Sequence, residues 1–247
     1  MRLTALFISL LLASIAFVSP VVAGDGVAVV ELFTSEGCSS CPPADALLAK
    51  LAAEARKSQQ AVYCLSFHVD YWDRLGWKDR FSHRAYTQRQ QDYARHLKLE
   101  SPYTPQIVIN GAQEFLGSDE PLVKGAIKLA LARKTDATVD LKASANGDEL
   151  LVDYKILGAP AGATLCVAWT EATAVSNPNR GENRGRKLAH VHVVRDFQTV
   201  TLKEPFAGQL SLKRQDSQPG SVIGFIQEAT SRQVLAANAQ EVGGRLR

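Results

Sequence analysis

Cysteine is scarce in this chain, and neither sign of charge is in clear excess. Four cysteines in 247 residues are too few for a fold built on disulfides, so the fold must depend on a hydrophobic core. Lysine and arginine (28) barely outnumber aspartate and glutamate (25), so the bulk charge gives no reason to expect nucleic acid or a membrane surface as a partner. After the N-terminal segment, no apolar run is long enough to span a membrane, so we expect no stable membrane span in the mature protein.

The N-terminal segment is typical of a secretory signal peptide. A basic start, Met1-Arg2, is followed by an almost unbroken apolar run over residues 3–18, and small residues precede a cleavage point after Ala23. The apolar run is shorter than the roughly 20 residues that a spanning helix needs. We therefore expect residues 1–23 to be removed and the remaining chain to be periplasmic or secreted, in a space where disulfides persist.

Two of the four cysteines stand close together in the segment Cys38-Ser39-Ser40-Cys41. This segment follows an apolar, strand-like run over residues 27–33 and precedes Pro42-Pro43 and a helical pattern rich in leucine and alanine. The positive end of a helix dipole stabilises a thiolate, so Cys38 is the expected nucleophile and Cys41 the resolving thiol. The spacing alone also fits half of a zinc site or an inert small-loop disulfide.

Strands and helices are expected to alternate in the first half of the chain. The expected strands are 27–35, 61–69, 106–110 and 114–116, with a hairpin turn at Asn110-Gly111, and the expected helices are 42–56, 77–98 and one starting near residue 118. This order, with a cysteine pair after the first strand, resembles the thioredoxin fold. It implies an α/β thioredoxin-like domain with a helical insertion over residues 24–135.

The segment from Tyr103 to Gly111 resembles the part of thioredoxin-like proteins in which a cis-proline opens a strand. The resemblance implies a cis Thr104–Pro105 bond, with Thr104 close enough to Cys38 to donate a hydrogen bond to its thiolate. It also implies that Pro105 keeps the loop backbone open to a substrate chain. Without the resemblance, Pro105 is simply the first residue of a strand.

Longer strings resemble a family of exported bacterial proteins known as domain of unknown function 1223. These strings are ELFTSEGCSSCPPAD at 31–45, HVDYWD at 68–73, LGWKD at 75–79 and GEN at 181–183. Membership of that family implies a thioredoxin-like fold and secretion, and it implies little about the reaction.

Further side chains are candidates for a proton relay or a substrate groove: Glu31, His68, Asp70, Trp72 and Trp77. His68 and Asp70 end the second expected strand on one face, where they would carry protons, line a groove with the tryptophans, or cap the strand. Glu31 would relay a proton to the resolving cysteine or have an ordinary strand role.

The remaining cysteines and two histidines favour structural roles. Cys64 and Cys166 each lie in an apolar run, so we expect two buried free thiols rather than a disulfide between them. His190 and His192 alternate onto one strand face without a visible third ligand, so a surface pair is favoured over a metal site.

The second half changes to short strands separated by turns such as Asn146-Gly147, which predicts an antiparallel β-sandwich-like domain over residues 136–247. The arginine- and glycine-rich segment 179–187 is expected to be a solvated hairpin loop. Its alternatives are docking of an acidic partner or folding back onto the first half.

Taken together, the sequence favours an exported thiol–disulfide oxidoreductase that needs no cofactor or bound metal. Its expected partners are protein or peptide thiols and disulfides, including a redox partner protein. Two alternatives stay open: a non-catalytic envelope binding or structural protein with a static Cys38–Cys41 disulfide, and a periplasmic copper carrier that uses both thiolates and His68.

Overall fold

The computed structural model describes residues 26–214 and 218–243, so the predicted signal peptide lies outside the described residues. The strands in the described ranges are β1 Ala28–Thr34, β2 Val62–His68, β3 Gln106–Ile109, β4 Gln113–Leu116, β5 Thr138–Asn146, β6 Glu149–Leu157, β7 Thr164–Ser176, β8 Leu188–Thr201, β9 Ala207–Lys213, β10 Gly220–Gln227 and β11 Val234–Val242. The helices are α1 Pro42–Ser58, α2 Arg84–His96 and α3 Glu120–Ala132, with a 3-10 turn η1 at Asp73–Leu75.

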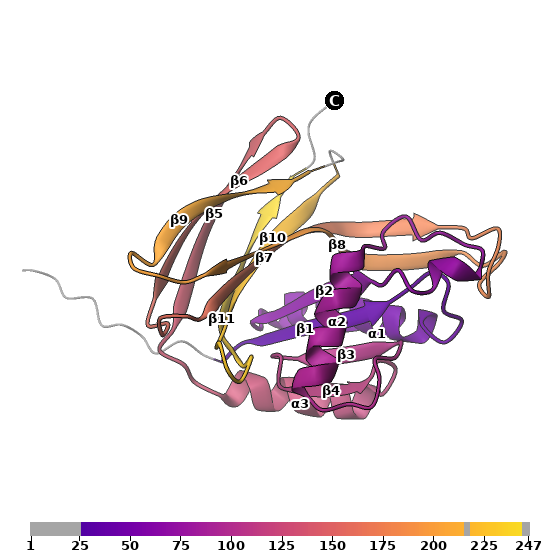
Figure 1. Cartoon of the computed structure of the whole chain (residues 1–247), viewed down its shortest axis with the longest axis horizontal. Coiled ribbons are helices and arrows are strands. Elements are labelled where there is room, and N and C mark those ends of the chain that lie inside the picture. Colours follow the sequence, from indigo (N-terminus) through magenta and orange to yellow (C-terminus); the bar gives the residue numbers. More distant parts are fainter. Residues whose placement is uncertain (1–25, 215–217, 244–247) are drawn as a thin grey trace, which may run out of the picture.

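The strands form two sheets (Figure 1). The larger sheet has eight strands in the order β11-β10-β7-β8-β2-β1-β3-β4, and the smaller has three in the order β5-β6-β9. Strand β1 runs parallel to β2 and antiparallel to β3. The hairpin predicted between β3 and β4 is confirmed. Asn110 and Gly111, with positive φ angles of 48° and 67°, are the central residues of a turn closed by a hydrogen bond from Ala112 N–H to the Ile109 carbonyl.

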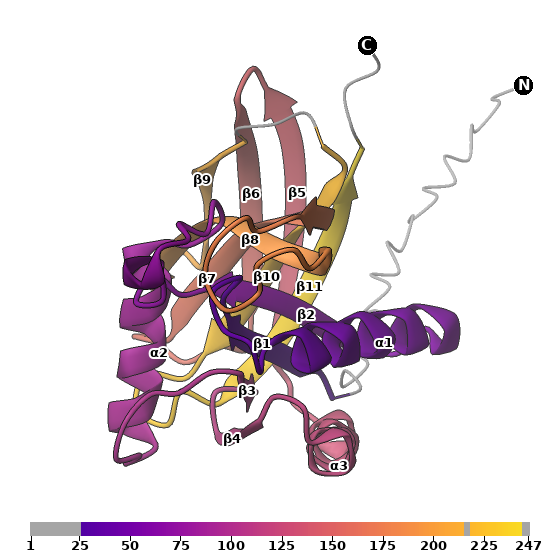
Figure 2. The same cartoon turned by 90° about the vertical axis from the view of Figure 1, so that its right-hand side faces the viewer.

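Alternation along β1 directs its side chains to two different cores. Val29 and Phe33 face a core that includes Tyr86 and Tyr93 of α2. Ala28, Val30 and Leu32 face a second core with α1 and α3, in a set that includes Leu47, Leu48 and Val123. Figure 2 shows the result, with α2 on one face of the sheet and α1 and α3 on the other.

The three-stranded sheet packs against the other end of the large sheet. Leu150 and Val152 of β6 share a buried core with Val167 and Trp169 of β7. A Cβ atom at Gly224 would lie 2.7 Å from Leu141 Cδ1, so the glycine permits this close approach of the two sheets.

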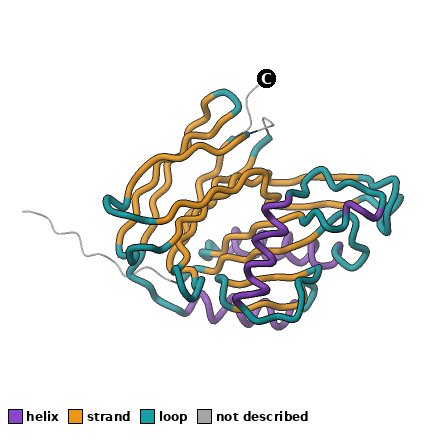
Figure 3. Tube along the Cα trace, viewed as in Figure 1, coloured by secondary structure: helices purple, strands orange, loops and turns teal. Residues whose placement is uncertain are grey.

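The long strands β7 and β8, of 13 and 14 residues, connect the two ends of the molecule. They pair with each other antiparallel, and β8 also pairs in parallel with β2 at Ser66 and Val193. The trace in Figure 3 shows this hairpin running from the three-stranded sheet across to the helical end.

This pairing overturns the expected fold class. The protein is not an α/β thioredoxin-like domain with a helical insertion followed by a separate β-sandwich-like domain. It is a mostly β protein in which strands from both halves of the chain form one mixed eight-stranded sheet beside a three-stranded sheet. Local periodicity found most of the strands, but it carries no information on the pairing of β2 with β8.

The helix expected over residues 77–98 begins later, at Arg84. His83 takes extended backbone angles and caps α2, because its Nδ1 accepts a hydrogen bond from Ala85 N–H at 3.2 Å. Within the described part of the chain, no helix combines the length and apolar character needed to cross a membrane.

Candidate functional site

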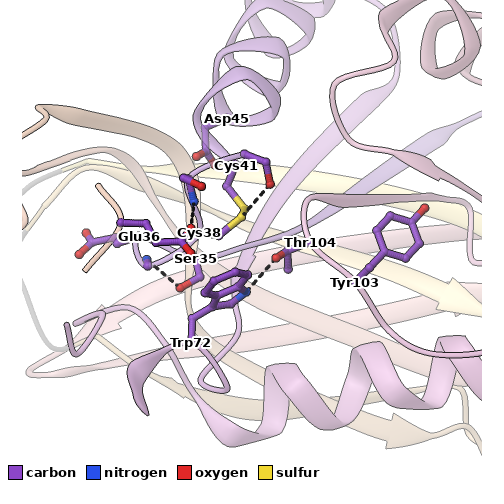
Figure 4. Close-up of a disulfide and its surroundings, with 12 residues drawn as sticks. Ser35, Glu36, Cys38, Cys41, Asp45, Trp72, Tyr103 and Thr104 are labelled. Atoms are coloured by element: carbon purple, nitrogen blue, oxygen red, sulfur yellow. Dashed lines mark hydrogen bonds between the residues drawn. A yellow bond between two sulfur atoms is a disulfide. The ribbon is translucent and has the colours of Figure 1, made fainter. Parts of the chain in front are cut away.

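Cys38 and Cys41 form a disulfide between the end of β1 and the start of α1. Their α-carbons are 5.4 Å apart, and the loop is closed by a hydrogen bond from Cys41 N–H to the Cys38 carbonyl at 3.2 Å. The predicted placement of the pair at a strand-to-helix junction is confirmed. Figure 4 shows the disulfide with Asp45 beside Cys41 and with Trp72 and Thr104 on the other side.

Both cysteines have no exposed surface, whereas Ser39 and Ser40 between them are exposed. The Ser40 hydroxyl lies 3.3 Å from Cys38 Sγ. Cys41 is the N-cap of α1, and prolines stand in its first turn. Their lack of N–H groups leaves fewer backbone donors for a thiolate than a helix N-terminus usually offers.

A loop from the second half of the chain closes over the cysteine loop. Asn183, which is fully buried, donates through Nδ2 to the carbonyls of Glu36 and Cys38, at 2.9 and 2.8 Å. Glu182 accepts a hydrogen bond from Ser39 N–H at 3.0 Å. The expectation of a solvated hairpin loop over 179–187 is therefore wrong at these positions, and the alternative of folding back onto the first half is confirmed.

The Thr104–Pro105 bond is cis, as expected. The Thr104 hydroxyl oxygen accepts a hydrogen bond from Trp72 Nε1 at 2.9 Å, which ties this loop to the segment after β2. In this oxidised form, the hydroxyl that contacts Cys38 Sγ is that of Ser40.

Five ionisable side chains form a buried cluster near the disulfide, and we call it the inner polar cluster: Glu36, Asp45, His68, Asp79 and His190. His68 Nδ1 and Asp79 Oδ2 are 2.6 Å apart. Burial alone would lower the pKa of His68, but the carboxylates of Asp79, Asp45 and Glu36 together outweigh burial and raise that pKa, with Asp79 contributing most. Burial would likewise raise the pKa of Asp79, but His68 and two backbone N–H groups lower it.

His190 joins the cluster from β8. Its Nδ1 lies 3.6 Å from Asp45 Oδ1, its Nε2 lies 3.8 Å from Glu36 Oε1, and its ring centroid is 4.7 Å from that of His68. Trp77 Nε1 donates to the other Glu36 oxygen at 2.6 Å. The expectation of a surface histidine pair is wrong for His190, because β8 pairs with β2 and carries its ring inside.

Glu31 lies on the opposite face of the sheet from α1. Its carboxylate is fully buried and accepts hydrogen bonds from Arg89 at 2.5 and 3.0 Å and from Tyr93 at 2.5 Å. The structure therefore places Glu31 in an ion pair with α2 and does not bring it to the cysteines.

Asp70 also points to α2, where its carboxylate accepts a hydrogen bond from the Thr87 hydroxyl at 2.6 Å. Of the candidate relay or groove residues, the structure brings His68, Trp72 and Trp77 to the surroundings of the disulfide. Asp70 instead connects the end of β2 to α2.

Cys64 and Cys166 are free and buried, as expected. Burial raises the pKa of Cys64 to about 12 and that of Cys166 to about 11, so both remain protonated thiols at neutral pH. In the described residues, no group of three or more histidine, cysteine, aspartate or glutamate side chains has an arrangement that would hold a metal ion.

Sequence reasoning missed several residues of this site: Glu36, Ser40, Asp45, Asp79, Asn183 and His190. Asp45 carried a usable signal, because it lies four residues after Cys41 on the same face of an expected helix. His190 and Asn183 carried none, since their contacts depend on the long-range pairing of β8.

Comparisons with known proteins cover most of the chain. The sequence model of the family described as "Protein of unknown function (DUF1223)" matches residues 29–227. The crystal structure of protein AGR_C_4864 from Agrobacterium tumefaciens is similar over 91% of this chain and 98% of its own, with 28% identity and a TM-score of 0.67. No protein of curated function matches the chain at a significant level.

Two glycosidases match weakly. A β-glucuronidase from Ruminococcus gnavus aligns with 46% of this chain and 16% of its own at 12% identity and a TM-score of 0.25. β-Glucosidase 3B from Thermotoga neapolitana aligns with 45% and 16% at 19% identity and a TM-score of 0.24. These scores are too low to support an inference.

Proposed function

Because the chain belongs to the family of proteins of unknown function DUF1223, whose description assigns no activity, we propose its function from the site: thiol–disulfide exchange with protein or peptide substrates through Cys38 and Cys41. The observation that carries this proposal is the disulfide at the N-terminus of the 17-residue helix α1, with a hydroxyl 3.3 Å from Cys38 Sγ. The helix dipole and a hydroxyl donor both favour a thiolate at Cys38. A periplasmic or secreted location belongs to the same proposal.

The exchange proceeds through a mixed disulfide. The Cys38 thiolate attacks one sulfur of a substrate disulfide, a Cys38–substrate bond forms, and the other substrate sulfur leaves as a thiolate. Cys41 then loses its proton and attacks Cys38 Sγ, which forms the internal disulfide and releases the second substrate sulfur. The substrate gains two electrons and the protein dithiol loses two. Run backwards, the same steps oxidise a substrate dithiol.

Both cysteines are fully buried. A substrate sulfur therefore reaches Cys38 only after the loop between β7 and β8, which contains Asn183, moves away from the cysteine segment. The two hydrogen bonds of Asn183 hold this loop at the cysteine segment. With a net contribution of about 1 kcal/mol each, they restrict the open form to a few per cent of molecules. Such a population supports exchange at a reduced rate.

A static structural disulfide is the second candidate function, and the same burial favours it. A sulfur pair without exposed surface is shielded from reductants as well as from substrates. Under this alternative, the pair stabilises the junction between β1 and α1, and the protein acts by binding.

A redox titration separates the two candidates. The chain from Gly24 onward is equilibrated in glutathione buffers of graded potential, trapped with a thiol reagent and weighed intact. We expect a midpoint within the range of about −120 to −270 mV that known thiol oxidoreductases span. A bond that stays closed below about −300 mV would establish the structural role. The double variant Cys38→Ser, Cys41→Ser, whose remaining cysteines are Cys64 and Cys166, controls for trapping of the buried thiols.

A further inference from the structure

The inner polar cluster contains buried polar atoms that have no hydrogen-bond partner among the residues that the structure describes. These atoms are Glu36 Oε1, Asp45 Oδ1, His68 Nε2 and both ring nitrogens of His190. Leaving a buried polar atom unpaired costs about 1–3 kcal/mol, and native proteins keep few of them without a reason. A purely structural polar cluster would be expected to satisfy these atoms, so their lack of partners points to a chemical role for the cluster.

Asp45 is the member of the cluster next to the resolving cysteine. It follows Cys41 by four residues on α1, which places both side chains on one helix face, and its N–H donates to the Cys41 carbonyl at 3.1 Å. Only 6% of Asp45 is exposed. Figure 4 shows it on the first turn of the helix beside Cys41.

His190 is the member of the inner polar cluster that comes from the second half of the chain. Its ring lies between two carboxylates, with Nδ1 3.6 Å from Asp45 and Nε2 3.8 Å from Glu36. Both separations exceed a hydrogen bond, and each closes with a small side-chain movement or one bridging water. The ionisable groups that face His190 are therefore Glu36 from the β1–α1 loop, Asp45 from α1 and His68 from β2. The His68 ring centroid lies 4.7 Å from that of His190, and His68 is itself paired with Asp79.

We infer that Asp45 accepts the proton of the Cys41 thiol when Cys41 attacks the mixed disulfide, and that His190 positions Asp45 and supports the transfer. The inference rests on the proposed thiol–disulfide exchange. As the S–H bond of Cys41 breaks, its proton moves to the Asp45 carboxylate, the Cys41–Cys38 bond forms, and the substrate sulfur leaves with the electron pair of its bond to Cys38. In the opposite direction, Cys41 leaves as a thiolate and takes the proton back.

The two halves of the chain therefore share one reaction. The cysteines and Asp45 come from the first half, and β8 brings His190 to them. This arrangement gives the parallel pairing of β8 with β2 a chemical consequence as well as a structural one.

Single-turnover kinetics test the inference. The reduced chain from Gly24 onward is mixed with oxidised glutathione between pH 5 and 9, quenched with acid and weighed, which separates formation of the mixed disulfide from its resolution. We expect Asp45→Asn to slow resolution by roughly a hundredfold, the lower end for loss of a general base, and to flatten its pH dependence. Formation should change by less than about twofold, because a proton acceptor for Cys41 takes no part in attack by Cys38.

Three variants sharpen the result. Asp45→Glu should recover part of the resolution rate, and His190→Gln should slow resolution less than Asp45→Asn and shift its pH profile. Glu54→Gln is the matched control, because Glu54 lies on the exposed side of the same helix and pairs with Lys124. It should leave both phases unchanged.

Failure of the inference and failure of the proposed function give different results. If Asp45→Asn resolves the mixed disulfide at the wild-type rate with the wild-type pH profile, the inference is overturned and exchange stands. If the wild-type chain forms no mixed disulfide at any pH, exchange itself is overturned. Should Asp45→Asn lose its circular dichroism signal, His190→Gln decides, and unchanged resolution in that variant overturns the inference.

Discussion

Cys38 depends on a side chain for part of its local hydrogen bonding. The first turn of α1 contains Pro42 and Pro43, which have no N–H to offer a thiolate, whereas the Ser40 hydroxyl lies 3.3 Å from the sulfur. In the reduced protein this hydroxyl would donate to the Cys38 thiolate and stabilise the reduced form.

Ser40→Ala should therefore make the pair harder to reduce. A net hydrogen bond of about 0.5–1 kcal/mol corresponds to a midpoint more negative by roughly 10–20 mV for a two-electron couple. The redox titration described above measures this shift. Ser39→Ala is the control, since Ser39 contacts Glu182 rather than a sulfur. An unchanged midpoint in Ser40→Ala would mean that the hydroxyl does not serve the thiolate.

The His68–Asp79 pair should make stability depend on pH. The pKa of His68 is raised above its ordinary 6.5, so the folded state binds the proton more tightly than the unfolded state. This contribution is complete below about pH 6.5 and is lost as the pH rises through the folded pKa. The pKa of Asp79 is lowered, so its contribution is present above its ordinary 3.8 and is lost as the pH falls through the folded value.

His68→Gln should accordingly flatten the decline in the free energy of unfolding above pH 6.5. Denaturant unfolding of the oxidised protein between pH 6 and 9 checks this expectation. His96→Gln provides a comparison, because His96 lies outside the cluster against the Ser231 carbonyl. If the free energy of unfolding of His68→Gln still declines above pH 6.5 as in the wild type, another titrating group causes the decline.

Among the elements, the loop between β7 and β8 lies over the cysteine segment and is hydrogen-bonded to it. Its buried Asn183 bonds two carbonyls of the cysteine segment, whereas its neighbour Arg184 is exposed. Asn183 thus holds the loop against the cysteine segment, whereas Arg184 faces solvent and is available as a matched control.

Asn183→Ala should increase the rate at which dithiothreitol reduces the disulfide by roughly ten- to thirtyfold, because it removes two hydrogen bonds of about 1 kcal/mol each from the closed form. Trapping of the released thiols over time measures the rate. Arg184→Ala should react at the wild-type rate. Equal rates in all three proteins would show that opening occurs elsewhere.

Elements with a strong local signal were predictable. The strand before the cysteines, helix α1 and the Asn110-Gly111 hairpin follow from periodicity, proline placement and turn chemistry. The start of α2 was not predictable. Trp77 fits the apolar spacing of the helix that follows, but it lies in a loop, and its indole N–H donates a hydrogen bond to Glu36. The spacing of apolar side chains gives no information on a hydrogen bond between residues 41 positions apart, such as that of Trp77 with Glu36.

At the scale of the whole molecule, the sequence did not indicate which strands pair with one another across the two halves of the chain. Nothing in the local sequence of β2 or β8 indicates that Ser66 and Val193 meet. The sequence therefore predicted a cysteine pair at a strand-to-helix junction, but it did not indicate the residues that β8 brings beside that pair. The same pairing joins the two halves in one hydrogen-bonded sheet.

The chain should consequently unfold in a single transition. The buried Arg89 bonds Glu31 of the first half and Gln227 of the second, so neither half keeps its polar core alone. Scanning calorimetry should give equal calorimetric and van't Hoff enthalpies for the oxidised protein. Two separate heat-absorption peaks would show that the halves fold independently.

The closure of the cysteine segment by Asn183 spans 145 positions of the chain. A ribosome adds roughly 5–20 residues per second, so the cysteines are made on the order of 7–30 s before the residue that covers them. Until Asn183 takes its place in the fold, its loop leaves the two thiols uncovered. In an oxidising space the disulfide therefore has an opportunity to form before the mature fold encloses it.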